Sequence, residues 1–284
     1  MIESPGTTAR DESQVLVIRP QGWWPRLEFG ELWAFRDLLL SLTIRDIKLR
    51  YRQTLLGIGW VVLQPLMAAA VLGFVFGRVA NLPAQGVPHF AMALVGVLSW
   101  TAFSGSLTRS SPAVVQNVSL VSRVFFPRVL LPLSAALASV VDVLIGMVLA
   151  AVIVWRSGVN LGAAALSAPL WVLATMLLGL GVGLAAAALM VRFRDVQHML
   201  PFLVQLTLLA SPVAYPVAAI PPRYRFVFQL NPLVGLIEGL RWSLLGLPPA
   251  SWFGILYAVA VTLLVFAAGM LFFRALERGF ADAI

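Results

Sequence analysis

The sequence has no cysteine, a single lysine and few charged residues. Without cysteine, no disulfide or thiolate chemistry is available to the chain. Its one lysine, Lys48, lies outside any GxxxxGK[ST] pattern, which excludes a phosphate-binding loop of that kind and ATP hydrolysis through it. The two histidines, His89 and His198, fall in separate loops, and no GxSxG motif occurs. We therefore expect no enzyme activity, no metal and no cofactor in this chain.

Charge is scarce along the whole chain, because only 11% of the 284 residues are charged whereas 60% are hydrophobic. Soluble domains carry roughly a quarter of charged residues. Several uncharged runs exceed the roughly 20 residues that cross the hydrocarbon core of a bilayer. The sequence predicts an all-α polytopic membrane protein with six transmembrane helices, near residues 57–77, 88–108, 130–155, 169–191, 199–217 and 251–273.

The distribution of cations predicts how these helices are oriented. Fifteen of the 20 lysines and arginines fall in the N-terminal segment, in the loops after the second and fourth helices, and at the C-terminus. Positively charged loops stay in the cytoplasm, so we expect both termini there. Residues 1–30 contain acids and no continuous apolar core, which indicates a cytoplasmic segment rather than a signal peptide. Nucleic-acid binding, the alternative for a net charge of +8, is disfavoured because the cations flank membrane spans.

The cations before the first span follow a helical pattern. On a helix, Arg45, Lys48 and Arg52 fall with Ser41 within a wedge of about 60°, between two apolar stripes. This pattern predicts an amphipathic interfacial helix over about residues 31–56, with its cations facing lipid phosphates on the cytoplasmic side. An ordinary positive anchor before a span is the alternative, and the pattern alone does not decide between the two.

Two loops on the predicted cytoplasmic side have features of contact surfaces. Prolines at both ends of the second-span loop predict a short helix over about 112–124, whose valines suit contact with lipid or with a partner protein. In the loop after the fourth span, Arg192 and Asp195 are spaced to pair at i, i+3. The alternative for that loop is a simple turn that fixes topology.

Prolines also divide the segment between the fifth and sixth spans into two short apolar pieces, 223–230 and 232–246. Neither can span a bilayer, which predicts a re-entrant hairpin on the outer side, with a loop on the outer leaflet as the alternative. Glu238 and Arg241 lie one helical turn apart and are predicted to pair. Asp142, the only acid within a predicted span, is interpreted as an inward-facing hydrogen-bonding residue rather than part of a proton relay.

Several segments, in order, resemble one known family. The chain from about residue 18 onward is similar to the membrane subunit of ABC-type polysaccharide exporters, the permeases for O-antigen, capsule and teichoic-acid export. The resemblance implies a homodimer of six-helix permease domains (57–284), each with a separate cytoplasmic ATP-binding subunit that binds ATP and Mg, and a lipid-linked polysaccharide as the substrate. A drug or lipid exporter permease and an ion-coupled carrier are the alternatives. The matching segments are RDIKLRYRQTLLGIGWVVLQPL (45–66), VFFPRVLLPL (124–133), RFRDVQHMLPFLVQL (192–206), SPVAYP (211–216), NPLVGLIEGLRW (231–242) and FADAI (280–284).

The resemblance also implies roles for particular segments: 31–52 as the interfacial helix, 112–124 as the coupling helix, and 220–246 as gate helices at the outer mouth. Aromatic side chains suit a channel for sugars because they stack on sugar faces and tolerate sliding, although tryptophan and tyrosine also gather at membrane interfaces. The candidate residues are Arg45, Lys48, Arg52, Leu56 and Gly57 at the cytoplasmic opening; Gln116, Asn117, Arg123, Arg192 and Asp195 for coupling to the ATPase; Pro232, Glu238 and Arg241 for the outer gate; and Trp60, Phe74, Trp100, Phe103, Tyr215 and Trp242 for the channel.

Overall fold

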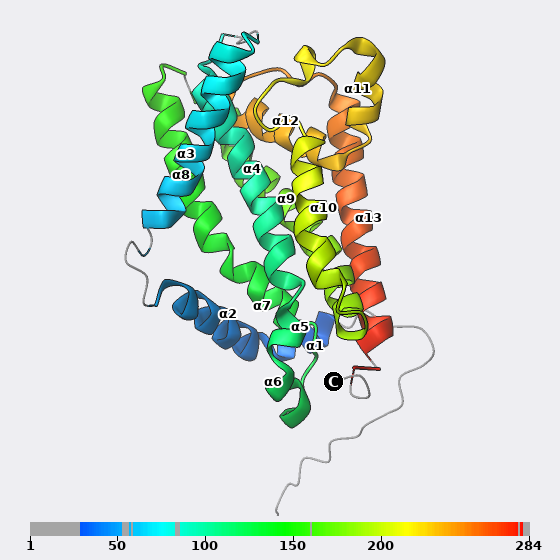
Figure 1. The fold of residues 1–284 in the computed structure, drawn as a ribbon. Helices are drawn as coiled ribbons and strands as arrows, with labels where there is room; N and C mark the ends of the chain where they lie inside the picture. The colour runs from blue at the N-terminus through cyan, green and yellow to red at the C-terminus, as the bar shows by residue number, and fades with distance from the viewer. Residues whose placement is uncertain are drawn as a thin grey trace, which may run out of the picture.

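A computed structural model of the chain describes residues 29–52, 57, 59–82, 86–159, 161–277 and 279–280. Within these residues the regular structure is helical and contains no strand (Figure 1). The all-α prediction is therefore confirmed for the described part of the chain. Most of the predicted N-terminal segment, the candidate Leu56 and residues 281–284 of the FADAI motif lie outside the described residues.

Among the residues that the structure describes, five helical stretches are long and apolar enough to cross a membrane: Gly59–Val79, His89–Ser110, Leu130–Arg156, Ala163–Arg192 and Trp252–Glu277. They match five of the six predicted spans, so the chain is a multi-pass membrane protein. The helices within them are α3 (Gly59–Phe74) with a π-helical last turn η1 (Val75–Val79), α4 (His89–Ser110), α7 (Leu130–Ala138) followed by α8 (Val140–Arg156), η2 (Ala163–Ser167) followed by α9 (Ala168–Arg192), and α13 (Trp252–Glu277).

The fifth predicted span is shorter than expected. The helix α10 (Val196–Leu209) has 14 residues, and the prediction that it continues to about residue 217 is wrong. At 1.5 Å per residue it is about 21 Å long, against a hydrocarbon core of about 30 Å. Pro212 and Pro216 explain the early end, because proline removes a backbone donor and disfavours helical geometry in the residue before it. Residues 210–216 instead form a non-helical segment.

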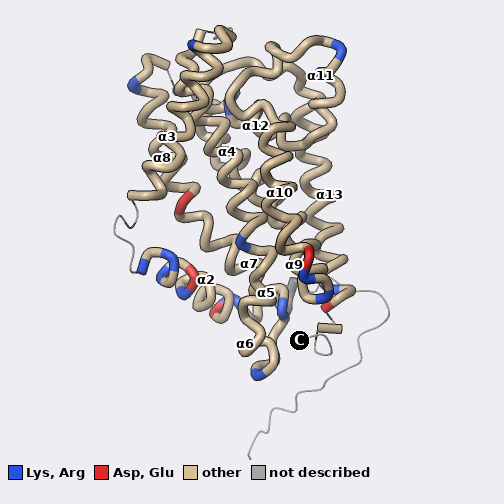
Figure 2. Tube along the Cα trace, viewed as in Figure 1, with Lys and Arg blue, Asp and Glu red and all other residues tan. Residues whose placement is uncertain are grey.

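Short helices occupy both ends of the bundle (Figure 1). At one end, here called the α2 end, lie α1 (Phe29–Ala34), α2 (Arg36–Tyr51), α5 (Ala113–Gln116) and α6 (Val118–Arg123). The opposite end, here called the α12 end, carries η3 (Val217–Ala219), α11 (Pro222–Gln229) and α12 (Pro232–Leu245). Most of the charged residues marked in Figure 2 lie towards these two ends, as expected for a protein whose middle lies in lipid.

Two predicted helices are each divided in the structure. The predicted 112–124 helix is interrupted at Asn117, whose backbone leaves the helical region (φ −117°, ψ 32°) and whose amide Nδ2 donates to the Ala113 carbonyl at 2.8 Å. Asparagine side chains compete with the backbone in this way, which is why they weaken helix interiors. The predicted 31–56 helix is likewise two helices, with a break at Phe35 and an end at Tyr51.

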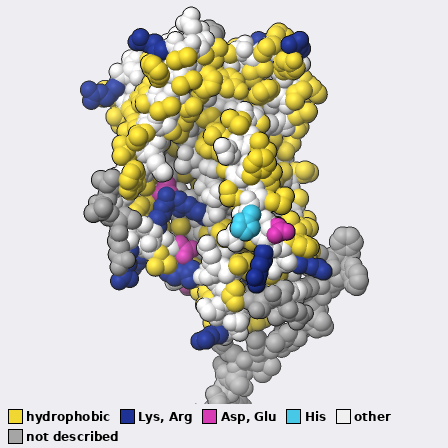
Figure 3. All heavy atoms as spheres, in the orientation of Figure 1, with side chains coloured by type: hydrophobic (Ala, Val, Ile, Leu, Met, Phe, Trp, Pro, Cys, Tyr) yellow, Lys and Arg dark blue, Asp and Glu magenta, His cyan; other side chains and the backbone are white. Residues whose placement is uncertain are grey.

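The centre of the bundle is a close-packed group of α4, α9 and α13. A Cβ at Gly179 of α9 would come within 2.3 Å of the Phe103 carbonyl oxygen of α4, and a Cβ at Gly269 of α13 within 2.0 Å of the Gly181 carbonyl oxygen of α9. These backbones therefore touch without side chains between them, as small residues allow in membrane helices. By contrast, α3 is largely unburied within the chain, and apolar side chains cover much of the face in Figure 3.

Candidate functional site

A buried carboxylate joins three helices near the α2 end. Asp142 of α8 has a side chain only 6% exposed, and its Oδ2 accepts a hydrogen bond from Arg109 Nη2 of α4 at 2.7 Å. Arg50 and Tyr51, the last residues of α2, also donate to this carboxylate. The prediction that Asp142 makes inward-facing hydrogen bonds is confirmed. Its partners were missed, because they lie 33 to 92 positions away in the sequence.

The cluster of Arg50, Tyr51, Arg109 and Asp142, here called the Asp142 cluster, is not neutral. Two guanidinium groups surround one carboxylate, and their side chains are 35% and 27% exposed. Burial of the tyrosine, together with its bond to Asp142, raises the pKa of Tyr51 to about 12, so its hydroxyl stays a donor. The cluster thus fixes the end of α2 against α4 and α8 and leaves one positive charge partly open.

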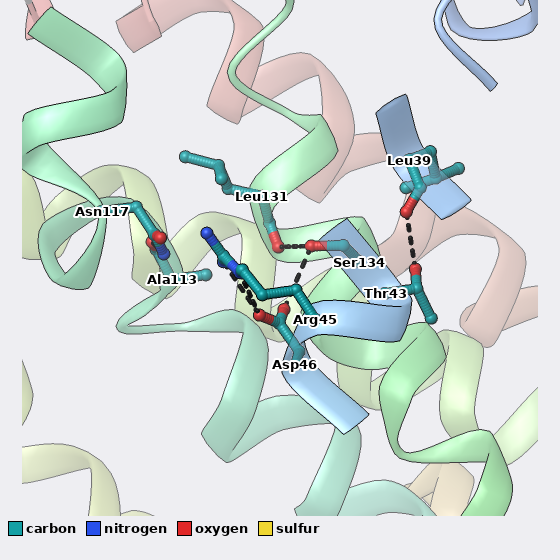
Figure 4. Close-up of polar contacts among 8 residues, drawn as sticks. All are labelled: Leu39, Thr43, Arg45, Asp46, Ala113, Asn117, Leu131 and Ser134. Carbon is teal, nitrogen blue, oxygen red and sulfur yellow. Dashed lines mark hydrogen bonds and ion pairs between the residues drawn. The ribbon is translucent and has the colours of Figure 1, made fainter. Parts of the chain in front are cut away.

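The middle of α2 is attached to α7 (Figure 4). Asp46 accepts two hydrogen bonds from Arg45, including Nη2 to Oδ1 at 2.8 Å, and a longer one of 3.4 Å from Ser134 of α7. Leu42 is 5% exposed in a core cluster that also contains Val114 of α5. The helix α2 therefore packs against a membrane span and shares a core cluster with the short helix α5.

The predicted opening residues have different surroundings. Arg45 is held by Asp46, whereas Lys48 and Arg52 are exposed. Gly57 has a positive φ of 50°, which glycine adopts without steric cost and which suits the predicted turn between α2 and α3. The cation wedge is therefore split: one member makes an ion pair within α2, and the other two face outward.

The predicted coupling residues lie on exposed surface at the α2 end. Gln116 and Arg123 are exposed. Asn117 is half-buried, and its side chain donates to the Ala113 carbonyl of α5. The buried side of α5 and α6 is provided by Ala113, Val114 and Val121, and Phe125 just beyond α6 is 81% exposed. Arg192 and Asp195 are also exposed, but no ion pair joins them; Arg192 lies over the Phe193 ring instead.

At the α12 end, the start of α12 agrees with the prediction, but the predicted ion pair between Glu238 and Arg241 is absent. Pro232 is the first residue of α12, and the Asn231 side chain caps it by accepting from the Leu233 amide at 3.0 Å. Glu238 and Arg241 form no ion pair. Glu238 accepts from the Ala250 amide at 3.3 Å, and burial raises the pKa of its carboxyl. Both residues line a cavity of about 60 Å³ at this end.

Arg241 uses its guanidinium on the main chain. Its Nη2 donates to the Val213 carbonyl at 2.7 Å and its Nη1 to the Tyr215 carbonyl at 2.9 Å. The expected pair with Glu238 is therefore wrong, because the non-helical segment after α10 offers buried carbonyls that need donors. Sequence spacing shows only that two side chains are neighbours on a helix, and a contact from elsewhere in the fold takes the arginine here.

The six predicted channel aromatics do not form one cluster. Trp60 and Phe74 are exposed on α3, while Phe103 is 5% exposed in the core and has the Trp100 ring 5.7 Å away. The other two candidates pair with aromatics that were not predicted. The ring of Tyr215 lies 5.4 Å from that of Phe76, and the ring of Trp242 lies 5.2 Å from that of Trp252.

The whole arrangement matches a known family of membrane proteins. The model of the ABC-2 type transporter family matches residues 37–245, from the start of α2 to the end of α12. The chain belongs to this family. The match includes the Asp142 cluster, α5, α6 and the Arg241 contacts, so the features described above lie within the ABC-2 domain itself. It confirms the resemblance drawn from the sequence motifs.

Relatives of this ABC-2 chain include named transport proteins. The O-antigen export system permease protein RfbA of Myxococcus xanthus is 31% identical over 259 residues, which are 89% of this chain and 98% of that protein. A Klebsiella pneumoniae protein of the same name is 26% identical over 253 residues, covering 87% and 95% of the two chains. The polysialic acid transport protein KpsM of Escherichia coli is 25% identical over 247 residues, covering 84% and 93%.

Proposed function

We propose that this chain is the transmembrane subunit of an ATP-driven exporter that moves a polysaccharide across the cytoplasmic membrane. The observation that carries the proposal is the similarity to an O-antigen export permease over 89% of this chain and 98% of that one. The family and the membrane helices agree with a transport role, and the lack of a phosphate-binding loop leaves ATP hydrolysis to another subunit.

The subunit that binds ATP and Mg docks, in this proposal, at the α2 end. That end exposes Gln116 of α5 and Arg123 of α6, together with Arg192 at the end of α9 and Asp195 in the loop that follows. Because α5 shares a core cluster with α2 and α7, a push on α5 reaches both the interfacial helix and a membrane span. The α2 end is then cytoplasmic, both termini lie on that side, and α10 with the segment that follows it forms the sixth crossing.

The substrate in this proposal is a lipid-linked polymer that passes between two copies of the chain. Lys48 and Arg52 are exposed cations on α2 and suit a phosphate-bearing lipid carrier or lipid headgroups at the cytoplasmic opening. The helices α11 and α12 form the outer gate. An ion-coupled carrier is disfavoured, because Arg50, Arg109 and Tyr51 already bind the Asp142 carboxylate.

The test is deletion of the chain in its host, followed by complementation and measurement of surface polysaccharide. We expect the deletion to remove one polymer from the cell surface and to leave its lipid-linked form inside. The purified chain alone should hydrolyse no ATP, and co-purification with an ATP-binding subunit should restore hydrolysis. Unchanged surface polysaccharide, or ATP hydrolysis by the chain alone, would contradict the proposal.

A further inference from the structure

Residues 210–216, which follow α10, are mostly buried although they are not helical. Within this segment, Ser211, Val213 and Ala214 are at most 4% exposed. The Ser211 carbonyl accepts from the Val213 amide at 2.8 Å. A buried carbonyl without such a local donor has little water near the membrane to replace it. The way these carbonyls are satisfied therefore decides whether the segment can keep its shape.

Three side chains donate to this region. Asn231 donates from Nδ2 to the Ala210 carbonyl at 3.3 Å and to Ser211 Oγ at 3.0 Å. Arg225 donates to the Ile220 and Ala218 carbonyls, which lie beyond residues 211–216. Arg241 donates to Val213 and Tyr215, as described above. The planar guanidinium suits this task because its donors are fixed in one fork, so a single side chain can hold two carbonyls.

Arg241 is the most deeply placed of the three. It is 4% exposed, whereas Arg225 is half-buried and also reaches an exposed carbonyl. A Cβ at Gly96 of α4 would come within 1.8 Å of the Val213 oxygen and 3.1 Å from Arg241 Nη2. The glycine thus lets the Val213 carbonyl lie directly against α4 while Arg241 binds it from α12. Val97 and Ile237 complete the contact by packing with Val213 in one apolar cluster.

The position of the Tyr215 backbone depends on the same guanidinium, because the Tyr215 carbonyl is the second acceptor of Arg241. With its backbone held there, the Tyr215 ring lies 5.4 Å from Phe76 in η1, the π-helical last turn of the first span. The two rings come from segments about 140 positions apart, so the pair exists only while the segment after α10 keeps its non-helical course. Glu238 forms no ion pair with the guanidinium and acts on it only through its charge.

We propose that Arg241 is a positioning residue for export: its two Nη groups hold residues 211–216 in a non-helical course and thereby place the Tyr215–Phe76 pair at the outer end of the polymer path. The inference rests on the proposed function and deepens it. It assigns Arg241 to the main chain of the segment after α10 rather than to a charge pair with Glu238.

The absence of cysteine makes a structural test direct, because introduced thiols are the only ones in the chain. Val97→Cys with Val213→Cys reports whether the segment lies against α4, using a short thiol-reactive cross-linker in native membranes. We expect efficient cross-linking with Arg241 present, a roughly tenfold loss with Arg241→Met because two buried carbonyls lose their donors, and an intermediate yield with Arg241→Lys. The matched control, Arg225→Met, should leave this cross-link unchanged.

Surface polysaccharide is measured in the same cells on the cysteine-free chain. We expect Arg241→Met and Tyr215→Ala each to lower export roughly tenfold, and their combination to lower it no further, because the two changes act through one structure. Export should be partly retained by Arg241→Lys and largely retained by Tyr215→Phe. If Arg241 served only folding, its replacement and Tyr215→Ala would lower export additively. Tyr215→Ala alone would then not lower export as far as Arg241→Met does.

The outcomes separate this inference from the proposed function. An unchanged cross-link in Arg241→Met, or normal export by Tyr215→Ala, would overturn the positioning role. The two measurements can also disagree. If Arg241→Met loses the cross-link but deletion of the chain leaves the surface polymer unchanged, the arrangement around Arg241 is supported and the export function is rejected. If Arg241→Met fails to insert, Arg241→Lys and Arg241→Gln carry the same comparison, and wild-type cross-linking in both would overturn the role.

Discussion

The Asp142 cluster predicts an unequal response to removing its acid or its bases. Asp142 is almost fully enclosed, whereas the side chains of Arg50 and Arg109 are 35% and 27% exposed. When the two arginines are replaced by methionine, the carboxylate stays buried with only Tyr51 as a partner. When Asp142 is replaced by asparagine, the arginines can turn towards water or lipid headgroups. We therefore expect the double arginine variant to be the less stable one.

The magnitudes follow from burial. Leaving a buried charge without its partner costs about 3–5 kcal/mol, and we expect Arg50→Met with Arg109→Met to approach that range. For Asp142→Asn the exposed fraction of the arginines discounts the ion pairs towards the surface value, and loss of the charge-assisted bonds leaves a cost of about 1–2 kcal/mol. The triple variant, Arg50→Met with Arg109→Met and Asp142→Asn, should recover much of the loss of the double variant, because no unpaired charge then stays buried.

The assay is unfolding of the purified chain in mild detergent, followed by denaturant titration and by thermal aggregation. Arg52→Met is the matched control: it is also near the end of α2, but it is exposed, and we expect a change below about 0.5 kcal/mol. A larger loss in Asp142→Asn than in the double arginine variant would refute the reasoning. So would equal losses in the double and the triple variant.

Three further predictions concern other parts of the chain. Gly269→Ala should destabilise the bundle by about 1–3 kcal/mol in the same assay, because its Cβ would lie 2.0 Å from the Gly181 oxygen, whereas Gly105→Ala, with nothing closer than 4.0 Å, should not. Burial raises the pKa of Glu238 above its ordinary 4.5. The protonated carboxyl therefore contributes to the free energy of unfolding below that pH, and this contribution is lost as the pH rises through the folded-state pKa. In Glu238→Gln this part of the pH dependence of stability should vanish, and a slope that persists would contradict the assignment. Phe125→Ser should leave the melting temperature unchanged, since the ring is 81% exposed, but should weaken co-purification of the ATP-binding subunit, and full recovery of that subunit would remove Phe125 from the docking surface.

The sequence predicts those features that depend on composition and on single residues. Uncharged runs locate five of the six predicted spans within about six residues, because charged side chains are costly in lipid. The two short helices at the α12 end are also predicted closely, as 223–230 and 232–246 against Pro222–Gln229 and Pro232–Leu245. Prolines begin both, and Gly246 ends the second with a left-handed φ of 68°, which glycine readily adopts.

Contacts between distant segments are what the sequence does not reveal. Nothing in the spacing of Arg50 or Arg109 points to Asp142, and nothing near Arg241 indicates that its partners are the carbonyls of Val213 and Tyr215. The two i, i+3 pairs fail for the same reason, because helical spacing creates proximity and the tertiary structure decides which partner a charge takes. The family resemblance, which depends on motifs rather than contacts, is confirmed where pairwise reasoning is not.

The glycine contacts of α9 have a mechanical consequence. Where peptide groups of α4, α9 and α13 touch directly, no layer of side chains lies between them to deform, so a displacement of one helix carries the others with it. In the proposed export cycle, these three helices therefore move as one rigid group, and α2 is tied to that group through Arg109 of α4 and Asp142. Movement relative to the group is left to α3, which is barely buried, and to α10, which stops short. The bundle therefore consists of one rigid group of helices with less tightly packed helices around it, and not of helices that each move independently.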